Sequence, residues 1–272
     1  MEVRRPWLAG LATFCLTAAA AGQTAVPKAP PSSEEQAALV AEVRRLALDY
    51  SQSLPNFLCT QITRRSAAPV RPGGEPSWKL QDTLTIQLSF FEQKESYRVV
   101  KVNGKAVDKP LEDLPGFKVK SDFGSMTKDI FEPASETHFD WDHPGVWNGR
   151  PSVVLSFRME PPHSVMSGKY KQNGTPVPFV LGCKGQIEVD WETRQVVGVT
   201  AESVDPPGSA VRDLRIAIRY GRQKIGNRDV LLPLDSVTTV SFWGKRSRTE
   251  NRFTGYRMYS ADSAISFDDP AK

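Results

Sequence analysis

Residues 80–107, LQDTLTIQLSFFEQKESYRVVKVNGKAV, decide the fold class. Between Leu84 and Phe90 an apolar residue occupies every second position, and Thr, Gln or Ser lies between. This period of two predicts a strand with one buried and one wet face. Asn103-Gly104 then separates the runs 97–102 and 105–107, and both turn residues tolerate a positive φ, so the pattern predicts a tight hairpin.

The same alternation returns along most of the remaining chain. Twenty-one prolines and nineteen glycines supply turn signals between the alternating runs. Some turns are short, as at residues 192–194, whereas parallel neighbours need a crossover of about a dozen residues or more. We therefore expect a mostly antiparallel sheet. The other predicted strands are Phe57–Arg65, Ser152–Met159, Gln186–Trp191, Val196–Ser203, Leu214–Tyr220, Leu231–Phe242 and Arg248–Tyr259.

A first helix is predicted before the strands. Ser33 precedes Glu34 and Glu35, an arrangement typical of a helix N-terminus, and Pro55 predicts the end of the helix. Apolar residues recur between these limits at helical spacing, so the helix is amphipathic and must pack against the sheet. The stripe consists of Leu39, Val40, Val43, Leu46, Ala47, Tyr50 and Leu54. We expect it to cover the face that bears Leu84, Ile86, Leu88 and Phe90.

A second, short helix is expected over Asp122–Phe131, because this segment lacks strand alternation and Pro133 follows it. The predicted fold is therefore α+β: a large curved, mostly antiparallel sheet with both helices on its concave face. No stretch repeats at a fixed period, and neither half of the chain has a complete core pattern. One domain is expected over residues 34–269, followed by a tail at 270–272.

The N-terminus has the form of an export signal. Arg4 and Arg5 precede an apolar run from Trp7 to Ala21, which ends in small residues. This run is shorter than the roughly 20 residues of a spanning helix. We expect residues 1–22 to be a signal peptide cleaved near Ala21, residues 23–33 to be a flexible linker, and the mature protein to be periplasmic or secreted and not an integral membrane protein.

Charge and cysteine content limit the partners and the chemistry. The balance of 35 Lys and Arg against 31 Asp and Glu is only +4, too weak for typical nucleic-acid binding. Cys59 and Cys183 remain after cleavage, and export would allow them to oxidise. Two alternatives stay open for this pair: a disulfide, or two separately buried thiols.

Three clusters are candidate sites. His138, Asp140, Asp142 and His143 are of metal-ligand type, but an extended strand would put His143 on the other face, so we expect no metal site and interpret this segment as a polar loop. Glu188 and Asp190 would share one strand face, as in a glycosidase pair, although solvated carboxylates are the commoner case. The third cluster is basic. It is either a binding site for anionic groups or a set of charges that keeps an edge strand from pairing with another molecule. It consists of Lys245, Arg246, Arg248, Arg252 and Arg257.

Common catalytic signatures are missing from the sequence. It contains no G-x-S-x-G, H-E-x-x-H, G-x-x-x-x-G-K-[ST] or G-x-G-x-x-G motif. We therefore expect a protein that is not an enzyme and needs no cofactor.

One hairpin resembles the periplasmic lipoprotein-carrier or outer-membrane lipoprotein-sorting family, and three further pieces are similar to a group of uncharacterised secreted bacterial proteins associated with the same architecture. The hairpin QIEVDWETRQVVG at 186–198 carries an Asp before its turn, as the family's hairpin does, and Leu232-Pro233 follows on a later strand. The other pieces are LPNFLCTQITRR at 54–65, LSFFEQKESYRVVKVNGK at 88–105 and DFGSMTKDIFEPAS at 122–135.

This resemblance implies an unclosed half-barrel with a helix-roofed apolar cavity, in a carrier of lipid or lipoprotein acyl chains. The apolar residues expected to line such a cavity are Leu84, Ile86, Leu88, Phe90 and Phe131. The alternative is that the same residues, with Trp141, fill an ordinary core. The expected function is an exported binding or carrier protein, with a structural or interaction protein of the envelope, or a carboxylate-dependent hydrolase, as alternatives.

Overall fold

The structure is a computed structural model that describes residues 29–70, 74–114, 123, 125–161, 163–172 and 175–259. The predicted signal peptide, most of the predicted linker and the tail at 270–272 lie outside the described residues. Within the described ranges, no helix is long and apolar enough to cross a membrane.

One large sheet dominates the molecule, and all of its strand pairs are antiparallel, as predicted. Its eleven strands lie in the order β4-β3-β2-β1-β13-β12-β11-β10-β9-β6-β5, and β7 and β8 form a separate two-stranded sheet. The strands are β1 (Phe57–Pro69), β2 (Lys79–Phe91), β3 (Lys94–Val102), β4 (Lys105–Pro110), β5 (His138–Trp147), β6 (Arg150–Met159), β7 (Ser167–Gln172), β8 (Thr175–Val180), β9 (Gly182–Asp190), β10 (Val196–Val204), β11 (Val211–Ile225), β12 (Arg228–Phe242) and β13 (Lys245–Met258).

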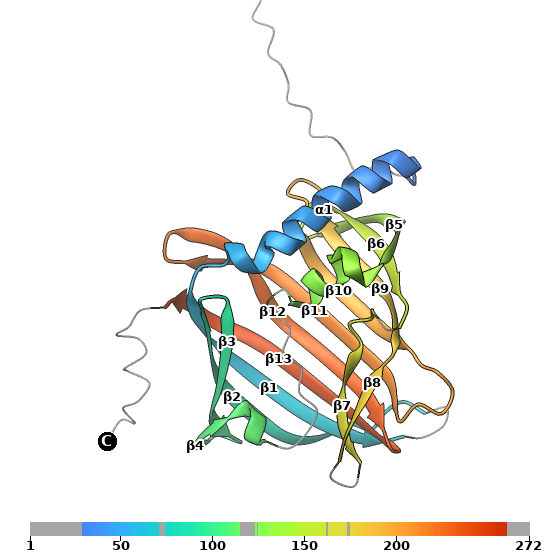
Figure 1. The fold of residues 1–272 in the computed structure, drawn as a ribbon. Helices are drawn as coiled ribbons and strands as arrows, with labels where there is room; N and C mark the ends of the chain where they lie inside the picture. Colours follow the sequence, from blue (N-terminus) through green and yellow to red (C-terminus); the bar gives the residue numbers. More distant parts are fainter. Residues whose placement is uncertain are drawn as a thin grey trace, which may run out of the picture.

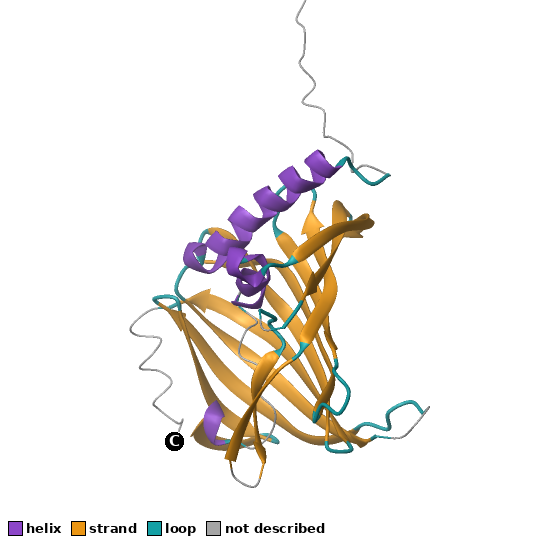
Figure 2. Cartoon of the chain, turned by 45° about the vertical axis from the view of Figure 1, so that its right-hand side comes forward, coloured by secondary structure: helices purple, strands orange, loops and turns teal. Residues whose placement is uncertain are grey.

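The sheet curls without closing into a barrel, because its outer strands β4 and β5 do not pair with each other (Figure 1). The helices α1 (Ser33–Ser53) and α2 (Ser125–Phe131) lie on the concave side, with α1 crossing one end of the sheet (Figure 2). Two short 3-10 turns, Leu111–Asp113 and Pro133–Ser135, complete the described elements. The expected half-barrel with two helices is confirmed.

The first helix begins one residue earlier than predicted. Ser32, not Ser33, is the N-cap, and it forms a capping box with Glu35: the Glu35 amide donates to Ser32 Oγ at 3.3 Å, and the Ser32 amide donates to Glu35 Oε2 at 2.8 Å. The helix ends at Ser53, directly before Leu54 and Pro55, as the proline predicts.

The concave face carries two apolar clusters rather than one. Cluster A joins Leu39, Val43 and Ala47 of α1 to Ile130 and Phe131 of α2 and to the inner faces of β6 and β9–β11. Cluster B joins the alternating residues of β2 to Phe57, Phe123 and Phe253. The expectation that α1 covers the face bearing Leu84 to Phe90 is therefore wrong. Only Tyr50 of α1 reaches cluster B, because the helix crosses the sheet near β9–β11.

A band of buried polar side chains lies on the inner face where β1, β13 and β12 run side by side. Gln61 and Thr63 face Ile86 and Leu84 across β1 and β2, so their side chains share the concave face. Asn251 Oδ1 accepts hydrogen bonds from Thr63 Oγ1 at 2.8 Å and Gln61 Nε2 at 3.1 Å. The buried Gln61 Oε1 has no hydrogen-bond partner among the residues that the structure describes. This band interrupts the apolar surface of the concave face.

Two sequence interpretations are corrected by the strand order. The segment Thr137–Pro144, interpreted as a polar loop, belongs mostly to the edge strand β5. The basic strand β13 is not an edge strand, because it pairs with β1 on one side and β12 on the other. Edge protection falls instead to β4 and β5, which carry Lys105, Lys109 and Pro144.

Candidate binding site

A cavity of about 250 Å³ lies between α1 and the sheet. The helix contributes one wall, Thr127 of α2 another, and residues of β10, β11 and β12, with Gln195 just before β10, the floor. Its lining residues are Leu46, Ala47, Asp49, Tyr50, Ser53, Thr127, Gln195, Val196, Tyr220 and Leu231. Asp49 is the one charged residue among these described lining residues, and its side chain is exposed at the rim.

Two tyrosines fix the shape of the cavity. Tyr50 Oη donates to the Leu231 carbonyl at 2.8 Å, and its ring meets that of Tyr220 edge-on, with centroids 6.0 Å apart. Tyr220 Oη lies 3.4 Å from Thr127 Oγ1. Burial raises the pKa of Tyr50 well above its usual value, and the neighbouring Tyr220 raises it further, so the phenol stays neutral.

This arrangement suits an uncharged, largely apolar group. Leu46, Val196 and Leu231 supply aliphatic surface, while Thr127 and Tyr220 supply hydroxyl groups at one side. Ligand pockets commonly combine apolar walls with a few polar groups that fix orientation, over volumes of roughly 300–1,000 Å³. The cavity is slightly smaller than that range and would hold one end of a ligand.

The predicted cavity-lining residues lie elsewhere. Leu84, Ile86, Leu88 and Phe90 come together in cluster B and are at most 2% exposed, whereas Phe131 lies apart in cluster A. Phe57 stacks on Phe90 at 5.2 Å and contacts Phe123 at 5.3 Å, so aromatic rings cover this part of β2. None of the five residues lines the cavity beneath α1.

Sequence reasoning missed the residues that do line the cavity. Tyr220 and Leu231 stand in strands that were correctly predicted, but alternation cannot distinguish a buried position that meets a cavity from one that meets another side chain. The position of α1 over these strands decides which buried residues meet the cavity and which meet another side chain. Gln195 follows a turn and carries no chemical signal of its own.

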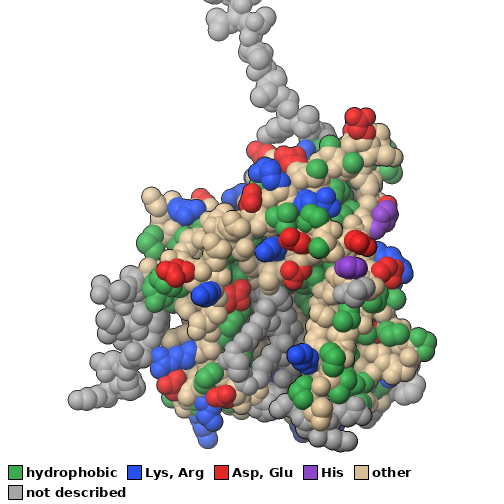
Figure 3. Space-filling view, viewed as in Figure 1, with side chains coloured by type: hydrophobic (Ala, Val, Ile, Leu, Met, Phe, Trp, Pro, Cys, Tyr) green, Lys and Arg blue, Asp and Glu red, His purple; other side chains and the backbone are tan. Residues whose placement is uncertain are grey.

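The histidine and aspartate cluster separates into two pairs on β5. His138 Nε2 lies 3.3 Å from Asp140 Oδ2, and His143 Nδ1 lies 3.1 Å from Asp142 Oδ1, with a register shift between Trp141 and His143. Among the described residues no group of three or more His, Cys, Asp or Glu side chains could hold a metal ion. In the space-filling view, charges of both signs and histidine side chains are interspersed around α1 and the β5 edge (Figure 3).

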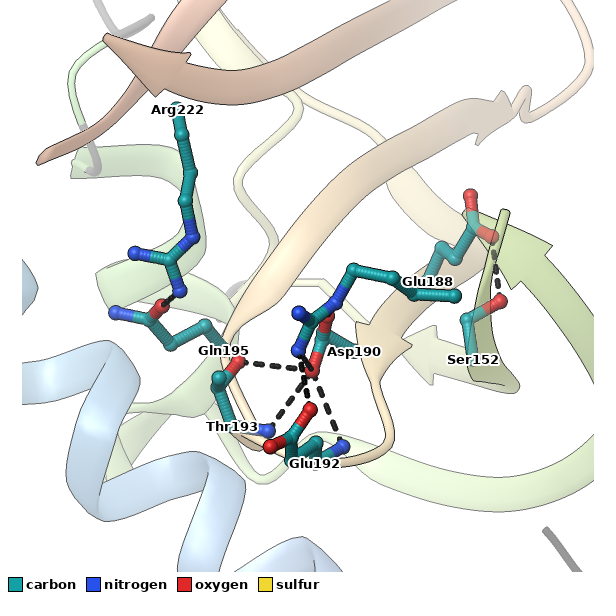
Figure 4. Close-up of polar contacts among 8 residues, drawn as sticks. Ser152, Glu188, Asp190, Glu192, Thr193, Gln195 and Arg222 are labelled. Carbon is teal, nitrogen blue, oxygen red and sulfur yellow. Dashed lines mark hydrogen bonds and ion pairs between the residues drawn. The ribbon is translucent and has the colours of Figure 1, made fainter. Parts of the chain in front are cut away.

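Glu188 and Asp190 take separate structural partners. Glu188 Oε1 accepts from Ser152 Oγ at 2.7 Å, and Asp190 accepts from Arg150 Nε at 2.7 Å and from the Thr193 amide at 2.8 Å (Figure 4). Burial acts to raise the pKa of Asp190, but hydrogen bonds from Arg150 and Thr193 outweigh it and lower the pKa. A general acid needs a raised pKa, so Asp190 is poorly suited to donate a proton.

Both cysteines of the described chain are free and buried, which corresponds to the second of the two alternatives left open by the sequence. Cys59 belongs to cluster B and Cys183 to cluster A. Burial raises the pKa of each thiol to about 12. Neither thiol is therefore a reactive nucleophile at neutral pH.

Several solved structures are similar to this chain at low sequence identity. Solved structures similar to this chain include a LolA superfamily protein of Nitrosomonas europaea (12% identity, TM-score 0.35, covering 83% of this chain and 96% of that chain) and an outer membrane lipoprotein-sorting protein domain of Vibrio parahaemolyticus (14%, 0.34, 82% and 92%). A DUF1329 family protein of Desulfovibrio piger is similar at 12% identity and TM-score 0.33, covering 83% and 93%. No family model and no curated protein sequence matches the chain.

Proposed function

We propose that this protein is an exported, non-enzymatic binding or carrier protein that holds the end of an acyl chain in the cavity beneath α1. The cavity itself is the observation that carries the proposal: aliphatic and aromatic walls enclose about 250 Å³ beside two hydroxyl groups. Each methylene group transferred from water to such a site gains about 0.8 kcal/mol. The hydroxyl groups of Thr127 and Tyr220 would meet a polar atom of the ligand.

Export and a periplasmic or secreted location form part of the same proposal. The charged start, the apolar run and the small residues near Ala21 support them. N-terminal sequencing of the exported protein checks this part, and a mature chain that still begins at residue 1 would contradict it.

Filling the cavity tests the binding site. Leu46 is half-buried on the wall of the cavity, so Leu46→Trp should occupy the space without entering a closed core. We expect native mass spectrometry of detergent-free protein to show a co-purifying lipid in the wild type, and Leu46→Trp to weaken binding of a fluorescent fatty acid by about tenfold or more. Arg45→Trp, on the exposed side of the same helix, is the matched control and should bind as the wild type does.

A structural or interaction protein with a filled core is the second candidate function. The close packing of Phe57, Phe90 and Phe123 over β2 favours it, because that part of the concave face is already covered. Absence of any bound lipid, with equal and negligible fatty-acid binding by the wild type and Leu46→Trp, would overturn the carrier proposal in favour of this candidate.

A further inference from the structure

A small aromatic patch stands at the turn between β12 and β13, at the end of the molecule away from α1 (Figure 1). Trp243 is 57% exposed although tryptophan is a large apolar residue. Its ring contacts Phe242 at 4.3 Å and Tyr170 of β7 at 5.8 Å, and Tyr170 contacts Phe242 at 5.1 Å. The three residues Tyr170, Phe242 and Trp243 are called the aromatic patch below.

Trp243 occupies a backbone position that its side chain disfavours. Phe242 pairs with Lys245, so Trp243 and Gly244 form a two-residue hairpin turn with φ of 45° and 76°. Asn103-Gly104 and Asn148-Gly149 make turns with nearly the same pair of φ angles, 51° and 79°, and 49° and 79°. Asparagine tolerates this left-handed conformation, whereas a bulky residue there is strained. The hairpin itself therefore gives no reason for tryptophan at this position.

Two exposed lysines adjoin the aromatic patch along the chain. Lys245 follows the turn, and Lys169 precedes Tyr170 on β7; both side chains are exposed, and no ion pair joins either of them to another described residue. Arg246 is half-buried and lies 3.8 Å from Asp213. An amphipathic indole with adjacent lysines is the combination that favours the head-group region of an anionic bilayer.

We propose that the aromatic patch and its lysines dock this end of the molecule on an anionic phospholipid membrane surface. Trp243 would enter the head-group region, while Lys169 and Lys245 would face the negative lipid charge. Contact with the membrane would then explain why this turn carries a tryptophan in a strained backbone conformation. This inference does not depend on the cavity beneath α1, which lies at the other end of the sheet.

The decisive variant separates folding from docking. Trp243→Asn introduces the residue that the turns at Asn103 and Asn148 carry, whereas the fourth such turn, Glu92-Gln93, carries other residues at φ of 48° and 63°. We therefore expect the melting temperature of Trp243→Asn to equal or exceed that of the wild type. The probe is vesicles of phosphatidylcholine with or without 30% phosphatidylglycerol, a fraction of roughly one lipid in three chosen to give the negative surface that attracts lysines. With protein purified after export, we expect wild-type binding only to the anionic vesicles, weakened by salt, and a loss of about tenfold or more in Trp243→Asn.

Phe91→Asn is the matched control. Phe91 is 41% exposed, but it lies at the opposite end of the sheet, because Phe57 pairs with Phe90 whereas Pro69 at the other end of β1 pairs with Lys245. It should bind vesicles as the wild type does. Undiminished vesicle binding by Trp243→Asn, equal loss in Phe91→Asn, or no wild-type binding at all would each overturn the proposal.

Discussion

The buried carboxylate of Asp190 holds a backbone turn through hydrogen bonds. Its side chain is 1% exposed and accepts from Arg150, from the Glu192 amide at 3.1 Å, and from both the amide and the hydroxyl of Thr193, so it fixes the turn between β9 and β10. Aspartate commonly holds turns in this way through the amides that follow it. We expect Asp190→Ala to lower the free energy of unfolding by about 2–3 kcal/mol, because several buried hydrogen bonds are lost together.

The pH dependence of this loss follows from the lowered pKa of Asp190. A carboxyl whose pKa is lower in the folded state stabilises the protein above its ordinary pKa of about 3.8 and loses this contribution as pH falls through the folded value. In urea titrations the wild type and Asp190→Ala should therefore differ most at neutral pH and converge below about pH 4. Glu192→Ala, which removes only an exposed partner of Arg150, should cost less than about 1 kcal/mol. A difference between wild type and Asp190→Ala that grows on acidification would contradict this account.

Single residues also show where inference from sequence stops. The period of two correctly marked Leu84, Ile86 and Leu88 as buried, and each is at most 1% exposed. It could not tell whether a ligand or Phe123 covers them, because both surroundings are apolar and give the same pattern. Tyr220 was marked as buried for the same reason, and its position beside the cavity appears only once α1 is placed.

At the scale of elements, α1 is attached through its own apolar side chains. Val43 is fully buried in cluster A, and aspartate at this position would bury a charge that the cluster cannot pair, at a cost of several kcal/mol. We expect Val43→Asp to detach α1 while β2 keeps its structure, since cluster B contains no fully buried residue of this helix. Hydrogen–deuterium exchange should show lost protection in α1 and retained protection in β2.

Arg45→Asp provides the comparison for that prediction. Arg45 is exposed on the same helix, so its replacement should change stability by less than about 1 kcal/mol and leave the exchange of α1 unchanged. Simultaneous loss of protection in α1 and β2 of Val43→Asp would show that helix and distant strands depend on each other, contrary to the two clusters.

The elements that could be predicted are those with an uninterrupted period. β2 and the middle of β11 alternate cleanly, and α1 combines a capping pair with a proline that follows its end. Strand β5 contains Pro144 and Gly145, and β8 contains Pro176 and Pro178, residues that weaken a strand pattern, so both strands escaped prediction. The pairing of β1 with β13 is a long-range choice that no local pattern specifies, which is why β13 was interpreted as an edge strand.

At the scale of the whole molecule, the sheet joins two clusters to which α1 contributes unequally: the buried residues of the helix lie in cluster A, and only Tyr50 also contacts cluster B. β12 contributes Val230 and Leu232 to cluster B and Leu231 and Val240 to cluster A. The ladders from β1 through β13 to β12 continue across the polar band without a break in pairing. These shared strands couple the clusters mechanically, so we expect the eleven-stranded sheet to unfold as one cooperative unit.

The two free thiols can test that expectation directly, because each lies in a different cluster. Folded thiols with a pKa of about 12 have almost no thiolate at pH 8, whereas unfolded thiols titrate near 9.0 and react readily. Pulsed alkylation across a urea series, with each cysteine quantified by peptide mass spectrometry, should give the same midpoint for Cys59 and Cys183. A clearly lower midpoint for Cys183 would mean that cluster A opens first, and the polar band formed by Gln61, Thr63 and Asn251 would then mark the boundary between two separately unfolding halves, because it is the place where apolar contact between the clusters is interrupted.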